Sequence, residues 1–383
     1  MQGLLTLCTT RHRQGGSSFM TEYERSGVDY SVLDGVKRAA VARAAATTPL
    51  LAASGAREFE GSRGATAYVV EVGGLTLAMV TEGLGTKSII TETYLEQSGE
   101  SRFADIAVDA VAAIVNDVIS VGANPMVITA YFATGDAAWY TDERKSLELL
   151  AGWQRACEES GAAWGGGESP ALPGMLTGAG IELGGSAVAV VPAGRRPVFG
   201  GDVRPGDRIV VLPSSGLHTN GASLARRIVS GLPSGLLTPL PSGRNLGAAL
   251  LDPSVLYPGF VRALLESPVE PHFLNPITGH GLLKMMRPAA DVRYVLDTLP
   301  EVPEVLDFLV AESGMSPAEA YSTLNMGFGY VAVVAEADAD RTVDVARKAG
   351  HQAFVAGEVV AGGKSVFLPS LGVEYRGEEL QIS

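Results

Sequence analysis

Residues 80–135 read VTEGLGTKSIITETYLEQSGESRFADIAVDAVAAIVNDVISVGANPMVITAYFATG, and the rest of the chain is interpreted around them. An apolar run of strand length at 75–80 leads into a glycine-bearing turn that ends in Lys87. Glycines let a backbone come close to a ligand, and a lysine adds a positive charge. The turn at 82–87 therefore predicts a phosphate site where a strand gives way to a loop.

A helix with acidic residues at regular intervals is expected after this turn. At about 100° per residue, Asn116 lies about 20° from Asp109 around the helix axis, so the two share a face two turns apart. Asp117 lies at the edge of the apolar arc, where a carboxylate is unfavourable unless it is paired or bound to a cation. Oxygen ligands beside a lysine suit Mg²⁺ carrying nucleotide phosphates. The alternative is a surface helix with solvated aspartates, and the upstream turn favours the metal.

The composition indicates a globular protein of two domains. The chain has 383 residues, more than one ordinary core holds, with 46% hydrophobic and 19% charged residues. A formal net charge of −13 without a basic cluster argues against nucleic acid or an anionic membrane as partner. Cys8 and Cys157 suggest neither a disulfide framework nor a metal site, which favours a cytoplasmic setting. No apolar run reaches membrane-spanning length.

Proline- and glycine-rich segments divide the chain. Residues 1–19 are interpreted as a disordered extension, with a targeting peptide as the alternative. The segment PAGRRPVFGGDVRPGD at 192–207 marks a boundary between an N-terminal domain at 20–195 and a C-terminal domain at 200–383. Strands are predicted at 67–72, 75–80, 127–132, 182–191, 208–212, 330–334 and 353–360, and helices at 31–45, 143–161, 252–265, 338–350 and from 222 onward. The closing strand-helix-strand pattern favours an α+β domain.

Two more glycine-rich segments carry candidate site residues. Residues 164–168, WGGGE, end in Glu168, and on spacing alone a tight turn without a ligand is favoured there. Residues 213–221, PSSGLHTNG, place His218 on a loop before a helix. Such a position offers N–H groups to a phosphate, and the helix dipole lowers the imidazole pKa, so a neutral base is favoured. His280, bracketed by glycines, is equally a ligand contact or loop filler.

Seven separated motifs occur in a fixed order along the chain. They are TEGLGTK (81–87), D-x6-ND (109–117), YFATG (131–135), GGES (166–169), PGM (173–175), SSGLHTNGxSL (214–224) and TLNMGFG (323–329). Together they resemble the phosphoribosylformylglycinamidine cyclo-ligase (aminoimidazole ribonucleotide synthetase) family. The likeness begins near Tyr23, where SGVD at 26–29 also fits, and continues to the end of the chain.

The resemblance implies a two-domain α+β fold and an ATP-dependent ligase of purine biosynthesis. The N-terminal mixed sheet would pair with a second copy to form a barrel across a homodimer. Family members bind ATP with Mg²⁺ in a cleft between the domains and phosphorylate an amide oxygen of formylglycinamidine ribonucleotide, a small phosphoribosyl amidine. A neighbouring nitrogen then closes the imidazole ring.

The resemblance also implies roles for individual residues. Glu82, Asp109 and Asp117 would bind metal. His218 would be the acid/base or charge-stabilising group, Glu168 would bind metal or orient substrate, and Lys87 would hold phosphate. The cofactor-binding residues would be Gly83, Gly85, Thr86, Lys87, Asn116, Gly166, Gly167 and Asn220.

Four departures from the family pattern stand in the sequence. Glu82 replaces an aspartate, and the extra methylene matters because Mg²⁺ tolerates distorted geometry poorly. Ala171 replaces an acidic residue, and Val255 replaces a frequent arginine. The family sequence HLTGGG reads PITGHG here, so a histidine is missing at Pro276 and another is gained at His280. These changes fit either a divergent branch with the same reaction or a relative with another substrate.

Two rival functions remain at this point. One is another superfamily member, such as selenophosphate synthetase, thiamine monophosphate kinase or a carbamoyl-dehydrating hydrogenase maturation factor. Selenophosphate synthetase usually has a reactive Cys or selenocysteine in an early glycine-rich segment, and the loop at 54–66 has none. The other is a catalytically silent nucleotide-binding subunit. The acids at 82, 109, 117 and 168 argue against it, because buried carboxylates without a ligand are unfavourable.

Overall fold

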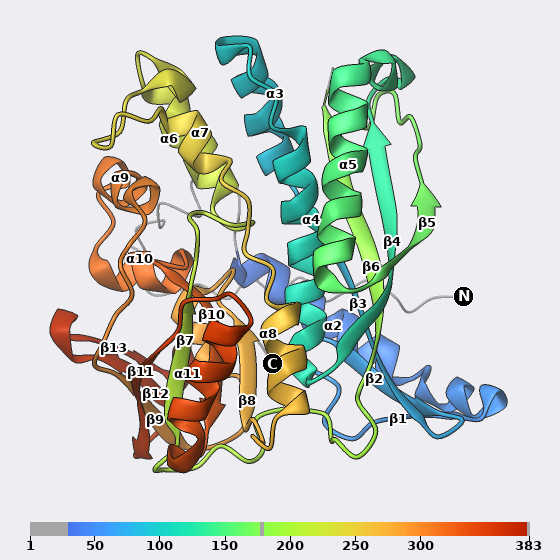
Figure 1. The fold of residues 1–383 in the computed structure, drawn as a ribbon, viewed down its shortest axis with the longest axis vertical. Helices are drawn as coiled ribbons and strands as arrows, with labels where there is room; N and C mark the ends of the chain where they lie inside the picture. The colour runs from blue at the N-terminus through green and yellow to red at the C-terminus, as the bar shows by residue number, and fades with distance from the viewer. Residues whose placement is uncertain (1–29, 177–179, 381–383) are drawn as a thin grey trace, which may run out of the picture.

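Residues 30–176 and 180–380 are described by the structure, a computed structural model with two β-sheets flanked by helices (Figure 1). The predicted extension at 1–19 and the SGVD motif at 26–29 lie outside the described residues. Within the described ranges, no helix combines the length and the apolar character needed to span a bilayer.

The first half of the chain forms a six-stranded mixed sheet in the order β1-β2-β3-β6-β4-β5. Its strands are β1 (Ala56–Glu58), β2 (Tyr68–Val72), β3 (Leu75–Gly83), β4 (Asn124–Thr134), β5 (Ala163–Glu168) and β6 (Ile181–Val190), and its helices are α2 (Tyr30–Ala45), α3 (Lys87–Ser98), α4 (Phe103–Val118) and α5 (Glu143–Ser160). Strand β6 runs antiparallel to both β3 and β4, whereas β4 and β5 are parallel.

The second half forms a seven-stranded sheet in the order β13-β12-β9-β11-β7-β10-β8. Its strands are β7 (Arg208–Pro213), β8 (Phe273–Pro276), β9 (Val292–Leu296), β10 (Phe328–Val334), β11 (Phe354–Ala361), β12 (Ser365–Leu368) and β13 (Val373–Arg376), and its helices are α6 (Ala222–Gly231), α7 (Leu246–Leu250), α8 (Pro258–Glu266), α9 (Glu304–Ser313), α10 (Pro317–Thr323) and α11 (Ala339–Lys348). Strand β7 is antiparallel to β10 and β11, and every residue of β10 is buried.

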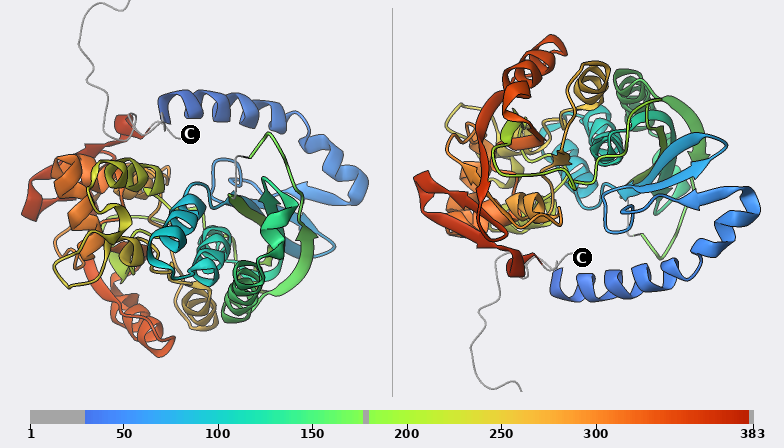
Figure 2. Two further views of the ribbon diagram at one scale, coloured as in Figure 1. Left: turned by 90° about the horizontal axis from the view of Figure 1, so that it is seen from above. Right: turned by 90° about the horizontal axis from the view of Figure 1, so that it is seen from below.

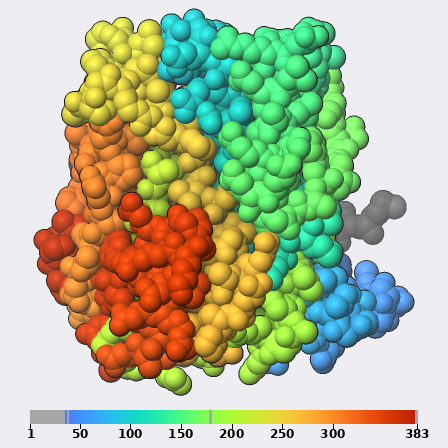
Figure 3. Space-filling model, in the orientation of Figure 1, coloured from blue at the N-terminus to red at the C-terminus, as the bar shows by residue number. Residues whose placement is uncertain are grey.

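Helix α4 lies where the two halves meet. Its sequence FADIAVDAVAAIVNDV is apolar on almost every side, as expected of a helix that is covered all round. It packs on β3 and β6 of the first sheet, against α3 and α5, and against β8 of the second sheet. Figure 3 shows the side chains of the two halves meeting along this face of the molecule. The polar residues of α4 are therefore placed at the boundary between the halves.

The predicted strands and helices are largely confirmed, with three differences in the site region. Strand β3 continues to Gly83, so Glu82 lies within a strand and not in a loop. The predicted turn at 164–168 is part of the edge strand β5, because Gly167 approaches β4 so closely that a Cβ atom would lie 2.0 Å from the carbonyl oxygen of Ala130. The predicted helix at 252–265 begins only at Pro258, which leaves the preceding segment extended.

Two surfaces of the first half expose large apolar side chains. Figure 2 shows α2 lying along the outside of the molecule, where Val36 is 67% exposed. On strand β4, Met126 and Tyr131 are 46% and 41% exposed. The helices α4 and α5 cover the opposite face of this sheet, so one face of the sheet is left open in the single chain.

Candidate active site

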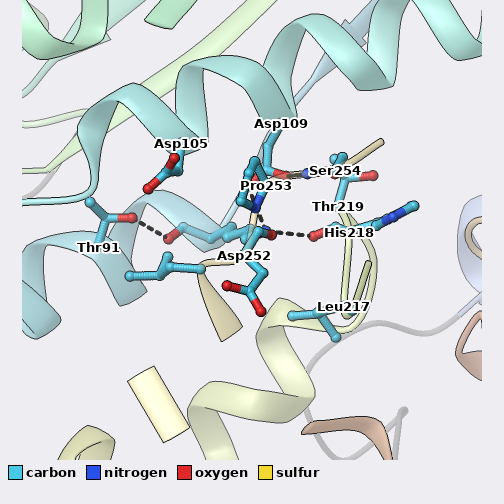
Figure 4. Close-up of polar contacts among 12 residues, drawn as sticks. Thr91, Asp105, Asp109, Leu217, His218, Thr219, Asp252, Pro253 and Ser254 are labelled. Atoms are coloured by element: carbon cyan, nitrogen blue, oxygen red, sulfur yellow. Dashed lines mark hydrogen bonds and ion pairs between the residues drawn. The ribbon is translucent and has the colours of Figure 1, made fainter. Parts of the chain in front are cut away.

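Lys87 and Asp109 form a buried ion pair at the boundary between the halves (Figure 4). The Nζ atom lies 2.6 Å from Oδ2 of Asp109, and both side chains are fully buried. Lys87, the first residue of α3, also donates to the carbonyl oxygens of His218 at 2.9 Å and Asp252 at 3.4 Å. These three acceptors use all the N–H groups of an ammonium. Lys87 thus joins the two halves, and the phosphate contact predicted for it stays a prediction.

Asp109 and Asn116 hold the extended segment before α8. Oδ1 of Asp109 accepts hydrogen bonds from the backbone N–H of Ser254 at 2.9 Å and from its hydroxyl at 2.5 Å. Asn116 donates to the carbonyl oxygen of Val255 at 2.9 Å and accepts from the N–H of Tyr257 at 3.0 Å. The shared helix face predicted for the two residues is confirmed. Both carboxylate oxygens of Asp109 have partners within the protein, and the metal-ligand role predicted for this residue stays a prediction.

Burial raises the pKa of Asp109, and the Lys87 ammonium and the bonds from Ser254 offset only part of this rise. The ion pair is therefore present in an environment that disfavours an unpaired charge. Removing either partner leaves the other charge buried and uncompensated.

His218 has its imidazole fixed by backbone donors. Its Nε2 accepts the N–H of Ser215 at 3.1 Å and that of Val255 at 3.5 Å, and it lies 3.1 Å from the Ser215 hydroxyl. Two backbone N–H groups aimed at one ring nitrogen favour the neutral tautomer that carries its proton on Nδ1. Burial, with a smaller effect of the Lys87 ammonium, lowers the pKa of His218 to about 3. The neutral imidazole predicted from the sequence agrees with this direction. The cause of the lowered pKa differs from the predicted one: burial and the Lys87 charge lower it, whereas a helix dipole was expected.

Asp117 contacts Glu82 and not Asp109. The Asp117 and Glu82 side chains are hydrogen-bonded, and burial raises the pKa of Asp117, which Lys284, Arg287 and Glu82 offset in part. Asp109 lies eight residues away on α4, about 12 Å along the axis. Among the described residues, no three His, Cys, Asp or Glu side chains gather closely enough to hold a metal. Of the three predicted metal ligands, the structure brings Glu82 and Asp117 together and places Asp109 apart from them, and their role in metal binding stays a prediction.

Two cations from the second half face this carboxyl pair. Lys284 and Arg287 both interact electrostatically with Asp117. Lys284 is buried and donates to the hydroxyl of Thr278, while Nη1 of Arg287 donates to that of Thr66 at 2.9 Å. Arg287 and Arg63 line a cavity of about 400 Å³. The sequence analysis missed both cations, although their spacing of three residues inside the apolar run GLLKMMR was a signal.

An acidic cavity of about 660 Å³ opens beside the pair and is lined by Glu82, Glu168 and Glu182. Oε1 of Glu182 accepts the N–H of Gly85 at 3.0 Å, and burial raises the pKa of Glu182, which this bond partly offsets. Gly83 also lines the cavity and has Glu182 beside it. Glu182 was not predicted as a site residue, because an acidic residue at the start of an apolar strand is typical of a solvent-exposed strand end. The glycine turn is thus held by a carboxylate of its own sheet.

The remaining predicted cofactor residues lie at two places. The hydroxyl of Thr86 lies 3.0 Å from that of Ser223 at the start of α6, and Asn220 donates to Thr219 at 3.1 Å. The residues near the glycine turn and those near His218 are therefore close together. Gly166 and Gly167 lie on β5, beyond β4, and Gly167 also lines the acidic cavity.

The structure explains two of the departures from the family pattern. His280 adopts a φ of 69°, a left-handed conformation that favours the glycine usual at this position. Val255 contacts Asn116 and His218 through its backbone, so these contacts do not depend on the side chain. Ala171 is exposed and Pro276 ends β8, and nothing in the structure explains these two replacements.

Comparisons with known proteins place this chain in a defined class. The family model "AIR synthase related protein, N-terminal domain" matches residues 64–191, and the model of the C-terminal domain matches residues 204–368. The chain is 33% identical to the phosphoribosylformylglycinamidine cyclo-ligase of Methanothermobacter thermautotrophicus, over 91% of this chain and 97% of the relative. It is 31% identical to that of Methanococcus maripaludis strain C6, over 89% and 92%. The chain belongs to the phosphoribosylformylglycinamidine cyclo-ligase family.

A solved structure supports the same fold. The hydrogenase maturation protein HypE in complex with ATP matches with a TM-score of 0.56 and 20% sequence identity, over 78% of this chain and 83% of that one. The resemblance and the two-domain fold predicted from the sequence are confirmed. The barrel across a dimer stays a prediction.

Proposed function

We propose that this chain catalyses ATP-dependent ring closure of formylglycinamidine ribonucleotide to aminoimidazole ribonucleotide, with release of ADP and phosphate. The proposal rests on family membership and on one observation. A carboxyl pair, Glu82 and Asp117, faces two cations, Lys284 and Arg287, where the two halves of the chain meet. Positive and negative groups facing each other suit a metal-bound polyphosphate, since phosphoryl transfer depends mostly on positioning and electrostatics.

Mg²⁺ is part of the proposal, and Glu82 and Asp117 are the residues that would hold it. Two carboxyl groups in contact favour a shared proton or a bound cation, and oxygen ligands suit Mg²⁺. When bound, the ion would neutralise charge on the nucleotide phosphates. Lys284 and Arg287 would bind phosphate oxygens that are not bound to the metal.

In the proposed reaction, bonds form and break only in ATP and the substrate, and the protein forms no covalent intermediate. The γ-phosphoryl group of ATP moves to the amide oxygen of the substrate, and ADP leaves. The neighbouring nitrogen attacks the carbon bearing this oxygen, the carbon–oxygen bond breaks, and phosphate leaves with the electron pair. His218 would donate a hydrogen bond through Nδ1 to the substrate, because its Nε2 is occupied. Glu168, which lines the acidic cavity, would orient the amidine.

Purified protein with ATP, Mg²⁺ and formylglycinamidine ribonucleotide is expected to release ADP, phosphate and a diazotisable aminoimidazole in equal amounts. Product formation is measured by diazotisation, and ADP by a coupled assay. If ADP forms only with another small-molecule acceptor, the chain is a kinase of the same superfamily. Absence of ATP turnover with every acceptor would support the silent nucleotide-binding subunit.

A homodimer is also proposed, built on the open face of the first sheet. The exposed side chains of Met126 and Tyr131 support it, because apolar surface of this kind marks an interaction site. Sedimentation equilibrium tests it, and a monomer at micromolar concentration would contradict it. A cytoplasmic location completes the proposal, since purine biosynthesis consumes ATP there.

A further inference from the structure

The turn that carries His218 is conformationally strained. His218 has a φ of 58°, and Met326 on the facing turn has a φ of 45°. Residues other than glycine rarely adopt such angles, and they persist only where surrounding contacts hold them. Both turns lie at the ends of strands that pair with each other, β7 and β10. The two turns therefore lie side by side, and hydrogen bonds between them can hold His218 and Met326 in these conformations.

Asn325 supplies these contacts. Its side chain is 4% exposed and makes four hydrogen bonds across the two turns. Nδ2 donates to the carbonyl oxygens of Gly216 at 2.8 Å and Leu217 at 3.2 Å. Oδ1 accepts from the hydroxyl of Ser214 at 2.8 Å and from the N–H of Gly327 at 3.0 Å. Each donor and acceptor of this amide is used, and the two donated bonds end at the two residues before His218.

Asn325 is linked to the His218 imidazole through the backbone of the 214–216 turn. The Ser215 N–H that fixes Nε2 of His218 lies in the same turn, between Ser214 and Gly216, both of which Asn325 contacts. If the backbone of this turn changes conformation, the Ser215 N–H no longer donates to Nε2. The neutral ring can then carry its proton on either nitrogen.

We propose that Asn325 is a positioning residue for the reaction: it holds the 214–218 turn so that His218 presents Nδ1–H to the substrate. Asn325 itself touches neither nucleotide nor substrate in this proposal. The role of His218 in turnover rests on the proposed function, whereas the control of its tautomer by Asn325 does not. Asn325 belongs to the sequence motif TLNMGFG at 323–329, so the proposal gives this motif a structural role.

The test compares Asn325→Ala with the matched control Asn275→Ala. Asn275 is also fully buried in the second half and donates to the carbonyl oxygen of Pro276, but it has no contact with the 214–218 turn. Nitrogen-15 NMR of histidine-labelled protein, assigned with His218→Gln, reports the protonation of each ring nitrogen. We expect the parent and Asn275→Ala to show His218 protonated on Nδ1 alone. We expect Asn325→Ala to show signals of a tautomer mixture.

Kinetics give the second readout. Asn325→Ala is expected to lower kcat by about 10²-fold, the scale of a displacement of about 1 Å in a reacting group, with a change in KM for ATP below about threefold. Asn275→Ala should keep kcat within about threefold of the parent. If Asn325→Ala keeps the tautomer, or keeps kcat within about threefold while the parent is active, the proposal is overturned.

The proposal can still be tested if Asn325→Ala does not fold or if the parent is inactive. If Asn325→Ala does not fold, Asn325→Asp replaces it, because this variant of the same shape keeps Oδ1 and replaces Nδ2 by an oxygen that cannot donate to both Gly216 and Leu217. An unchanged His218 tautomer in Asn325→Asp would overturn the proposal. If the parent shows no cyclo-ligase activity, the proposed function fails, and the NMR comparison still decides whether Asn325 positions His218.

Discussion

Replacing Lys87 with methionine is expected to lower the free energy of unfolding by about 3–5 kcal/mol, the usual effect of breaking a buried ion pair. The reason is that Asp109 would keep a charge with no counter-ion at a fully buried position. The carbonyl oxygens of His218 and Asp252 would also lose their donor. Urea denaturation, read by far-ultraviolet circular dichroism, measures the change.

Glu159→Gln is the control for this prediction. Glu159 pairs with Arg155 on the exposed side of α5 at 4.0 Å, so its removal should cost less than about 1 kcal/mol. The double variant Lys87→Met with Asp109→Asn should lose less than the sum of the single losses, with a coupling of about 1–3 kcal/mol. A loss from Lys87→Met as small as that from Glu159→Gln would show that the pair does not hold the halves together.

Replacing Asp117 with asparagine is expected to lower turnover by about 10²-fold or more, because a metal ligand stabilises several kcal/mol of transition-state charge. Stability should not fall with it. Burial raises the pKa of Asp117, so its environment disfavours the carboxylate, and the neutral amide relieves that penalty. Steady-state rates at varied Mg²⁺ and a thermal melt without ligand measure the two effects. A raised Mg²⁺ requirement is expected for the variant.

Asp105→Asn on the same helix is the matched control. Asp105 pairs with Arg102 and lies twelve residues from Asp117, about 18 Å along α4. Its replacement should leave the Mg²⁺ dependence of the rate unchanged. The metal-site assignment is wrong if Asp117→Asn turns over like the parent, or if it merely unfolds while Glu82→Gln keeps full activity.

Helical periodicity predicted part of this site correctly. The spacing of Asp109 and Asn116 placed them on one face, and both bind the segment before α8. It could not supply their partners, because Ser254 and Tyr257 lie about 140 residues further along the chain, and no local rule reports such contacts. Lys87 and Asp109 were assigned to a ligand for this reason, although in the structure they neutralise each other.

The position of Asp117 was the more informative signal. A carboxylate at the edge of an apolar arc predicted a counter-charge or a cation, and the structure provides Glu82, Lys284 and Arg287 around it. Glycines were less informative, since Gly167 permits the close contact of β5 with β4. Sequence patterns thus indicated where a charge needs a partner, while the fold determined which residue provides it.

The central claim is that ATP activates an amide oxygen of the substrate by phosphorylating it. The most direct test uses formylglycinamidine ribonucleotide carrying oxygen-18 at this amide, with ATP and Mg²⁺, and mass analysis of the phosphate released with each aminoimidazole formed. One labelled oxygen is expected in each phosphate, because the amide oxygen leaves with the phosphoryl group. Aminoimidazole formed together with unlabelled phosphate would contradict it.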